Sequence, residues 1–378
     1  MFKKILGAAA ALIVALALYL SLWPVPIEPV VWSTPPFPYN AAYVGAHARN
    51  TKLANLKHIS IGTEEGPEHI MLGPDGKLYA AVASGAILRM APDGSQQSKL
   101  VSTGGRVLGF DFDAAGNLIA ADALRGLLSI APDGKLTVLT DKVSANDPIR
   151  YADAVVVAKT GKMYFTDASQ RFGPKEWGGT FEASVLDIIE HSSTGRVLEY
   201  DPATKVTRVI FTDLCFANGI ALSKDQRHLF VNETGAYRTW KVEIGPAALS
   251  AKMSAKTPSD KARVLLDNLP GYPDNLMRGQ GVANQDRIWL GFAKPRGKAI
   301  DDMAGKPFLR KLTLRLPRAL WPVPPTYGHV IAFDDDGKIV ADLQDPAGSY
   351  PETTAITETD TRLYVQSLHA KTLGWIAK

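Results

Sequence analysis

The 378-residue sequence contains a single cysteine, Cys215, so it cannot form an intramolecular disulfide. It also lacks the Gly-x-Ser-x-Gly, His-Glu-x-x-His, Cys-x-x-Cys and glycine-rich phosphate-loop motifs, and with them the usual signatures of serine hydrolases, zincins, thiol oxidoreductases and nucleotide-binding enzymes. Because Cys215 lies in an apolar run, it is predicted to be a buried small hydrophobic residue. The formal net charge is only +4, and we expect no nucleic-acid partner.

Six short apolar strands recur along the chain, each preceded by another apolar strand and a turn. Their first residues lie 40 to 75 positions apart, and the shorter spacings match the roughly 40 to 50 residues of one four-stranded propeller blade. The pattern predicts an all-β fold, a six-bladed β-propeller, in which the inner strands meet at one axis. The six strands are Leu78–Ala81, Leu118–Ala121, Met163–Thr166, Leu229–Asn232, Ile288–Gly291 and Leu363–Gln366.

The N-terminal segment predicts a membrane anchor. Residues 5–23 are uncharged and mostly apolar, and they follow Lys3 and Lys4; at 1.5 Å per residue they would cross about one hydrocarbon core. The lysines place the N-terminus in the cytoplasm and the propeller on the periplasmic, extracytoplasmic or lumenal side. A cleaved signal peptide is the alternative, because Ala15-Leu16-Ala17 is an acceptable cleavage site.

We therefore divide the chain into an anchor or signal peptide (1–23), a Pro-rich linker acting as a stiff spacer (24–53) and the propeller (54–378). Residues 57–61 are expected to supply the closing strand of the last blade, which leaves no free sheet edge. Two insertions, at 171–193 in blade three and 294–325 in blade five, are expected to cover the binding face.

Oxygen-bearing side chains occupy the starts of four predicted inner strands, where otherwise apolar sequence surrounds them. Three carboxylates and two amides that meet in a partly dry tunnel would repel one another without a cation. Hard oxygen ligands without thiolates or clustered histidines point to calcium before magnesium or manganese. The alternative is that these residues only cap strand ends and turns. The five are Glu68, Asp153, Asn218, Asp274 and Asn275.

Histidines are dispersed, and only His69 is expected near this site. Its side chain should point away from the tunnel, because it follows Glu68 directly and strand neighbours face opposite sides. We expect it to pack between blades.

Several motifs together resemble the strictosidine-synthase-like family, in its membrane-anchored branch. The resemblance covers the chain from about Ala54 onward, and this branch is similar in turn to the paraoxonases and to the gluconolactonase and senescence-marker group, which are calcium-dependent ester and lactone hydrolases on six-bladed propellers. It implies that Glu68, Asn218 and Asp274 hold the catalytic metal, with Asp153 and Asn275 completing or flanking the shell. The motifs are residues 122–128, 164–169, 195–198, 216–220, 269–275 and 363–368.

Two positions depart from the relatives that this resemblance suggests. Strictosidine synthases use a glutamate on the inner strand of blade six, where this chain has Thr354, so true strictosidine synthase activity is not expected. Paraoxonases have a histidine near the start of the second inner strand, where this chain has Leu108-Gly109. A histidine-based lactonase mechanism of that kind is therefore not expected either.

The remaining interpretation is a membrane-anchored hydrolase of esters or lactones that depends on calcium. The ion would polarise the carbonyl group of an apolar substrate, and Asp274 would activate water and also bind the metal. The alternative is a propeller without catalytic activity that binds a lipid or protein partner.

The blade-five insertion predicts a second membrane contact. Residues 294–318 hold eight basic residues and two aspartates, and Phe308, Leu312 and Leu316 recur at helical spacing before Pro317. This pattern predicts a short basic amphipathic helix, and the nearby Trp321 suits an interface. The alternative is a helix that packs its apolar face on the propeller rim and leaves its basic side chains in solvent.

Overall fold

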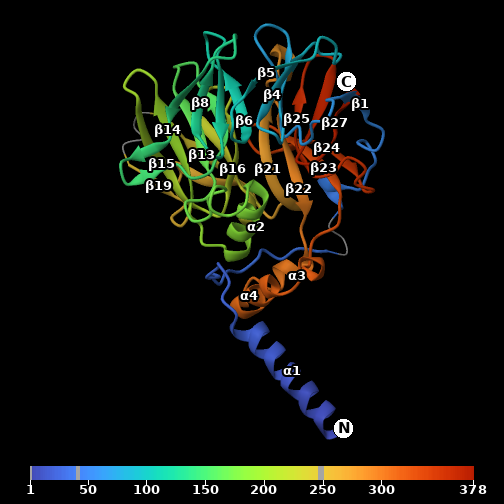
Figure 1. Cartoon of the computed structure of the whole chain (residues 1–378). Coiled ribbons are helices and arrows are strands. Elements are labelled where there is room, and N and C mark those ends of the chain that lie inside the picture. The colour runs from blue at the N-terminus through green and yellow to red at the C-terminus, as the bar shows by residue number, and fades with distance from the viewer. Residues whose placement is uncertain (1, 40–42, 246–250) are drawn as a thin grey trace.

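Six antiparallel sheets surround a central axis and form a six-bladed propeller, with a helix projecting from one end (Figure 1). The computed structural model describes residues 2–39, 43–245 and 251–378. The first strand of each blade contacts the first strands of its neighbours, so these six strands line the axis. The predicted fold class is confirmed.

The first three blades follow the chain in order. Blade one holds β2 (His69–Leu72), β3 (Leu78–Ala81), β4 (Ala86–Met90) and β5 (Ser98–Ser102); blade two holds β6 (Val107–Phe112), β7 (Leu118–Asp122), β8 (Gly126–Ile130) and β9 (Leu136–Thr140); blade three holds β12 (Ala152–Val157), β13 (Met163–Asp167), β14 (Gly195–Asp201) and β15 (Val206–Leu214). The pair β10 (Lys142–Ser144) and β11 (Asp147–Pro148) precedes blade three, and β19 (Met253–Ser254) pairs with the edge of β15.

The last three blades include the ring closure. Blade four holds β16 (Ala217–Leu222), β17 (His228–Glu233), β18 (Arg238–Glu243) and β20 (Ala262–Leu266); blade five holds β21 (Gly271–Arg278), β22 (Ile288–Pro295), β23 (Gly328–Phe333) and β24 (Ile339–Asp345); blade six holds β25 (Thr353–Glu358), β26 (Arg362–Ser367), β27 (Thr372–Ala377) and β1 (Lys57–Ser60). Short 3-10 turns lie at Gly45–His47 (η1), Thr234–Ala236 (η2), Val282–Asn284 (η4) and Arg318–Leu320 (η5).

The ring is closed by β1, as predicted, which pairs antiparallel with β27 from Lys57 opposite Trp375 to Ser60 opposite Thr372. Within the blades, tight turns follow Asp-Gly steps such as Asp75-Gly76, where Gly76 has a φ of +73°, a conformation that glycine adopts without a Cβ clash. Apolar side chains fill the spaces between adjacent blades, and Trp240 and Trp289 are among the largest that are fully buried.

Both predicted insertions lie on one face of the propeller. Each joins the second strand of its blade to the third, which returns the chain to the face where the inner strand begins. The blade-three insertion carries α2 (Thr180–Glu190), and the blade-five insertion carries α3 (Lys298–Asp301) and α4 (Pro307–Arg315). All three helices lie between the propeller and the N-terminal helix (Figure 1).

The N-terminal helix α1 (Phe2–Leu22) stands away from the propeller, and none of its residues is buried. It is long and apolar enough to cross a membrane, with a mean hydropathy of 2.5, although signal sequences share these properties. Its last turn contacts α4, because the guanidinium of Arg315 donates to the carbonyl oxygens of Leu20 and Trp23, at 3.1 and 2.7 Å.

The linker, predicted to be a stiff spacer, packs against the insertions. Ile27 is completely buried, and the Val30 amide donates to the carbonyl of Glu190 at the end of α2, at 2.8 Å. The ring of Trp32 stacks on His191 with centroids 3.9 Å apart. These backbone hydrogen bonds and ring contacts between distant segments cannot be read from proline content alone.

Candidate functional site at the propeller axis

Each of the six blades places one polar residue at the start of its inner strand, and all six line one cavity. The sequence predicted four of them, and the structure brings these four together. It adds two that the sequence reasoning missed, Arg106 in blade two and Glu352 in blade six. In blade order the six are Glu68, Arg106, Asp153, Asn218, Asp274 and Glu352.

Irregular pairing occurs where these side chains leave the strands. The register shifts between Ala152 and Val155, between Ala217 and Ile220, and between Pro273 and Leu276. Such bulges redirect a side chain and are frequent next to binding sites. They turn Asp153, Asn218 and Asp274 toward the cavity.

Close contact between two inner strands sets the position of Asn218 beside Asp274. A Cβ atom added to Gly219 would lie 2.4 Å from the carbonyl oxygen of Asp274, so only glycine permits this approach. The Asn218 amide donates a hydrogen bond to the Asp274 carboxylate. Asn232 fixes the same strand by donating to the Asp274 carbonyl oxygen at 2.6 Å.

Burial disfavours the simultaneous ionisation of these carboxylates. It raises the pKa of Asp153 well above its usual value, and the charges of Glu68 and Asp274 raise it further. Burial and the charge of Glu68 likewise raise the pKa of Asp274 far above normal, against the hydrogen bond from Asn218. A bound cation would favour the ionised forms instead.

Two features test whether the residues fit a cation. The side-chain oxygen of Asn218 is buried without a hydrogen-bond partner, although buried polar atoms are normally paired. It lies in the same cavity as the carboxylates of Glu68, Asp153 and Asp274. One amide oxygen and three carboxylates that line the same cavity form a donor set typical of calcium.

Arg106 partly neutralises the negative charge of the site, because its guanidinium forms an ion pair with Glu68. Burial raises the pKa of Glu68, and the charge of Arg106 partly offsets this effect. The chain therefore supplies part of the positive charge that the site needs.

One of the five predicted ligands, Asn275, lies outside the cavity wall. Asn275 donates its amide to the carbonyl oxygen of Glu68 at 3.0 Å and is not among the lining residues, so its amide nitrogen supports the backbone that carries Glu68. Thr354 does the same from blade six, at 2.9 Å. His69 packs between blades as predicted, its ring 4.6 Å from that of Phe110, and burial lowers its pKa to about 3.

The expectation that only His69 would lie near the site is wrong, because His369 lines the cavity. Its ring nitrogen Nδ1 contacts a carboxylate oxygen of Glu352, whose other oxygen accepts from Lys294 at 2.8 Å. The hydrogen bond that His369 donates to the Glu352 carboxylate raises the pKa of His369 above its usual value. Glu352 has a φ of +51°, a strained conformation that is frequent at functional sites.

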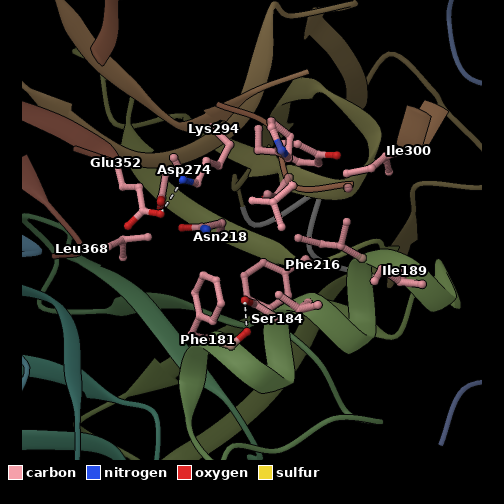
Figure 2. Close-up of a pocket in the computed structure, with 18 of the residues that line it drawn as sticks. Phe181, Ser184, Ile189, Phe216, Asn218, Asp274, Lys294, Ile300, Glu352 and Leu368 are labelled. Carbon is pink, nitrogen blue, oxygen red and sulfur yellow. Dashed lines mark hydrogen bonds and ion pairs between the residues drawn. The ribbon is translucent and has the colours of Figure 1, made fainter. Parts of the chain in front are cut away.

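The cavity has a polar floor and apolar walls, and its volume is about 260 Å³. Figure 2 shows Asn218, Asp274, Lys294 and Glu352 grouped on one side. Side chains of α2 and the blade-five insertion form the apolar walls, with Phe181 below the polar group and Ile189 and Ile300 across from it (Figure 2). The arrangement suits a molecule with one polar group and an apolar body.

A second cluster joins the linker to blade five. His47, His329 and Asp342 offer ligand atoms that lie within 4.8 Å of one another. One oxygen of Asp342 contacts both rings at 2.9 Å, and its other oxygen accepts from Gln344 and Asn50. Hydrogen bonds thus account for this cluster without an ion.

Cys215 is fully buried, as predicted, with its sulfur 3.1 Å from Nδ1 of His191. Burial raises the pKa of its thiol well above the usual value. A nucleophilic thiolate is therefore disfavoured here.

The six-bladed fold and its acidic axial site define the class of protein, and relatives define the family. Family models described as strictosidine synthase and as strictosidine synthase-like, N-terminal, match residues 153–244 and 45–90. Strictosidine synthase-like protein 7 of Arabidopsis thaliana is 32% identical over 92% of this chain and 88% of its own length, and protein 6 is 34% identical over 80% and 76%. The chain belongs to the strictosidine synthase-like family.

Further similarities reach an animal protein and solved structures. The adipocyte plasma membrane-associated protein of Danio rerio is 28% identical over 85% of this chain and 77% of its own length. A gluconolactonase from Xanthomonas campestris superposes with a TM-score of 0.57 at 16% identity, over 94% of this chain and 99% of that one. The calcium-binding protein regucalcin from Agrobacterium tumefaciens gives 0.56 at 13%, over 85% and 93%. At these identities the solved structures share the fold.

Proposed function

We propose that the protein is a membrane-anchored, calcium-dependent hydrolase of esters or lactones. The observation that carries the proposal is the unpartnered oxygen of Asn218 beside Asp274, at the polar floor of an otherwise apolar cavity. Glu68, Asp153, Asn218 and Asp274 would hold the ion. Calcium bound there would polarise a carbonyl group and stabilise the negative charge that develops on its oxygen.

The side chains of the site divide the remaining work. Asp274 accepts a proton from the attacking water, and the apolar walls exclude other water from the cavity. His369, held by Glu352, is a second group that can accept or return a proton in the same cavity. The anchor is α1, and the Danio rerio relative is named as a plasma membrane-associated protein.

The test is hydrolysis of a panel of aryl esters and lactones by the purified full chain, with calcium and with chelator. Asp274→Asn keeps an oxygen ligand but removes the base, so we expect the rate to fall by about 10²- to 10⁴-fold. Asp286→Asn is the control, since that carboxylate is 73% exposed and pairs with the surface Lys224. Full turnover by Asp274→Asn, or equal rates with calcium and chelator, would contradict the proposal.

The Arg106–Glu68 ion pair favours a second candidate, a propeller that binds an apolar ligand without turning it over. In that case the guanidinium replaces the cation, and neither calcium nor chelator changes ligand affinity. Ligand binding without hydrolysis of any ester in the panel would support this alternative.

A further inference from the structure

The basic residues of the blade-five insertion are largely engaged within the protein. The Arg310 guanidinium donates to four carbonyl oxygens, from Val30, Ile189, Glu190 and Ala304. Lys311 pairs with Glu28 at 2.7 Å. Lys294, Arg296, Lys298, Arg315 and Arg318 also have partners within the chain. These partners within the chain reduce the charge that the insertion offers to anionic lipid.

The most deeply buried side chains of α4 are polar, although Leu314 also packs against the core. The buried residues of the helix are Arg310, Thr313 and Arg315, whereas Phe308 is 54% exposed. Proline at the first helical position and Pro317 just after the last fix its ends. An apolar side chain in solvent and buried arginines behind it indicate that the outer face meets something other than water.

Exposed apolar residues continue around α4 on neighbouring segments. We name this surface the apolar collar; its residues are Trp23, Val30, Val31, Phe308, Leu320 and Val323, which are 48% to 63% exposed. The segments are held together, because Arg315 binds the Trp23 carbonyl oxygen and Arg310 binds that of Val30. Val323 also lines the cavity, so the collar reaches its mouth.

The anchor indicates what covers the collar. At 1.5 Å per residue, the 21 residues of α1 span about 32 Å, close to the thickness of one hydrocarbon core. A bilayer spanned by α1 therefore ends near Trp23, where Arg315 joins the helix to α4. Tryptophan is enriched at this level of a membrane.

We propose that the apolar collar rests in the bilayer surface and that the cavity opens toward it, so that the ligand enters from the lipid. The ligand class is an acyl or alkyl ester or lactone that partitions into membranes. The ligand class rests on the proposed function, whereas the membrane contact does not.

The contact is tested on the full chain in phosphatidylcholine nanodiscs, with a nitroxide on one introduced cysteine. Cys215 is fully buried, so reagents label the introduced residue. Leu320→Cys and Phe308→Cys are compared with Val282→Cys, which is 91% exposed in the connection from β21 to β22 on the opposite face.

We expect the ratio of collisions with oxygen to collisions with a water-soluble nickel chelate to be at least fivefold higher at 320 and 308 than at 282. Added salt should not change it, because the contact is apolar. Ratios at 320 and 308 equal to that at 282 would overturn the membrane contact.

Entry from lipid is tested without turnover, using nanodiscs that contain a long-chain alkyl ester with a diazirine in its chain. Photolysis should crosslink it to α2 at the cavity wall, near Phe181 and Val185. Val185→Trp, which fills the cavity, should remove these crosslinks and keep those to α1. Crosslinks to α1 alone in the unmodified chain would overturn the entry route. Loss of hydrolysis with α2 crosslinks intact would contradict only the proposed function.

Discussion

Replacing Glu352 by glutamine should lower the pKa of His369. Glu352 contacts His369 through one carboxylate oxygen and Lys294 through the other. The glutamine keeps the size of the side chain but removes its charge. The imidazolium then loses a charged acceptor, and Lys294, left without its counter-ion, disfavours a second positive charge nearby.

The size of the change follows from the geometry. A hydrogen bond to a charged group contributes about 1.5 to 3 kcal/mol, and one pKa unit corresponds to about 1.36 kcal/mol. The His369 side chain is 50% exposed, so solvent screening reduces this contribution. We expect the pKa of His369 to fall by about one unit.

Stability changes in a defined window of pH. Because the pKa of His369 is raised above 6.5, its contribution is present below that value and is lost as the pH rises through the folded-state pKa. The pKa of Glu352 is lowered below 4.5, since the hydrogen bonds from His369 and Lys294 outweigh the effect of burial. Its contribution is present above 4.5 and is lost as the pH falls through its folded-state pKa.

The assay is an NMR titration of the histidine ring carbons, in which His369→Gln identifies the resonance. If His369 accepts a proton during turnover, the acidic limb of the pH–rate profile should move to lower pH by the same amount. Glu176→Gln is the control, because that side chain is 53% exposed and lies near Arg150. An unchanged pKa of His369 in Glu352→Gln would refute the reasoning.

Two further predictions concern stability. Calcium at a hundredfold excess over its Kd should raise the free energy of unfolding by about 2.7 kcal/mol relative to chelator; Asn218→Ala should abolish the resulting rise in Tm, and equal Tm values for the unmodified chain would contradict the ion site. Arg310→Ala should lower the unfolding free energy by about 3 kcal/mol in denaturant titrations, because it removes hydrogen bonds to four carbonyl oxygens, of which those of Glu190 and Ala304 keep the amides of Val30 and Trp32 as donors. Lys311→Ala should cost at most about 1 kcal/mol, since its partner Glu28 is exposed; equal losses would show that Arg310 is solvated.

Local sequence signals predicted the propeller, its closing strand and both insertions, because strands and tight turns depend on neighbouring residues. Asp153 and Asn218 occupy equivalent places in different blades, so the symmetry of the fold brings them together at the axis. The repeat and the position of each residue within it were therefore enough to predict that these two side chains meet.

The missed residues depend on structure that the repeat does not encode. Glu352 lies just before β25 in a left-handed conformation, and His369 lies in the turn between β26 and β27. Arg106 occupies the expected place but is a cation, so it does not share the oxygen-bearing side chain from which the other positions were predicted.

The helix α4 shows the limit of helical spacing. Residues 308, 312 and 316 predicted an amphipathic helix, and α4 indeed spans Pro307–Arg315. Neither predicted orientation accounts for Arg310 and Arg315, whose partners are carbonyl oxygens of α1, the linker, α2 and the insertion itself. Backbone acceptors on other segments cannot be predicted from the sequence of the helix itself.

The pairing of β1 with β27 constrains how the protein can be made. Residues 57–60 leave the ribosome early, yet their partner strand at 372–377 is synthesised after every other blade. If α1 enters the membrane first, β1 remains beside the bilayer with an unpaired edge, and such an edge promotes aggregation. Completion of the ring then follows the synthesis of all the other strands and takes place at the membrane surface, and folding yield should depend on chaperones that shield this one strand.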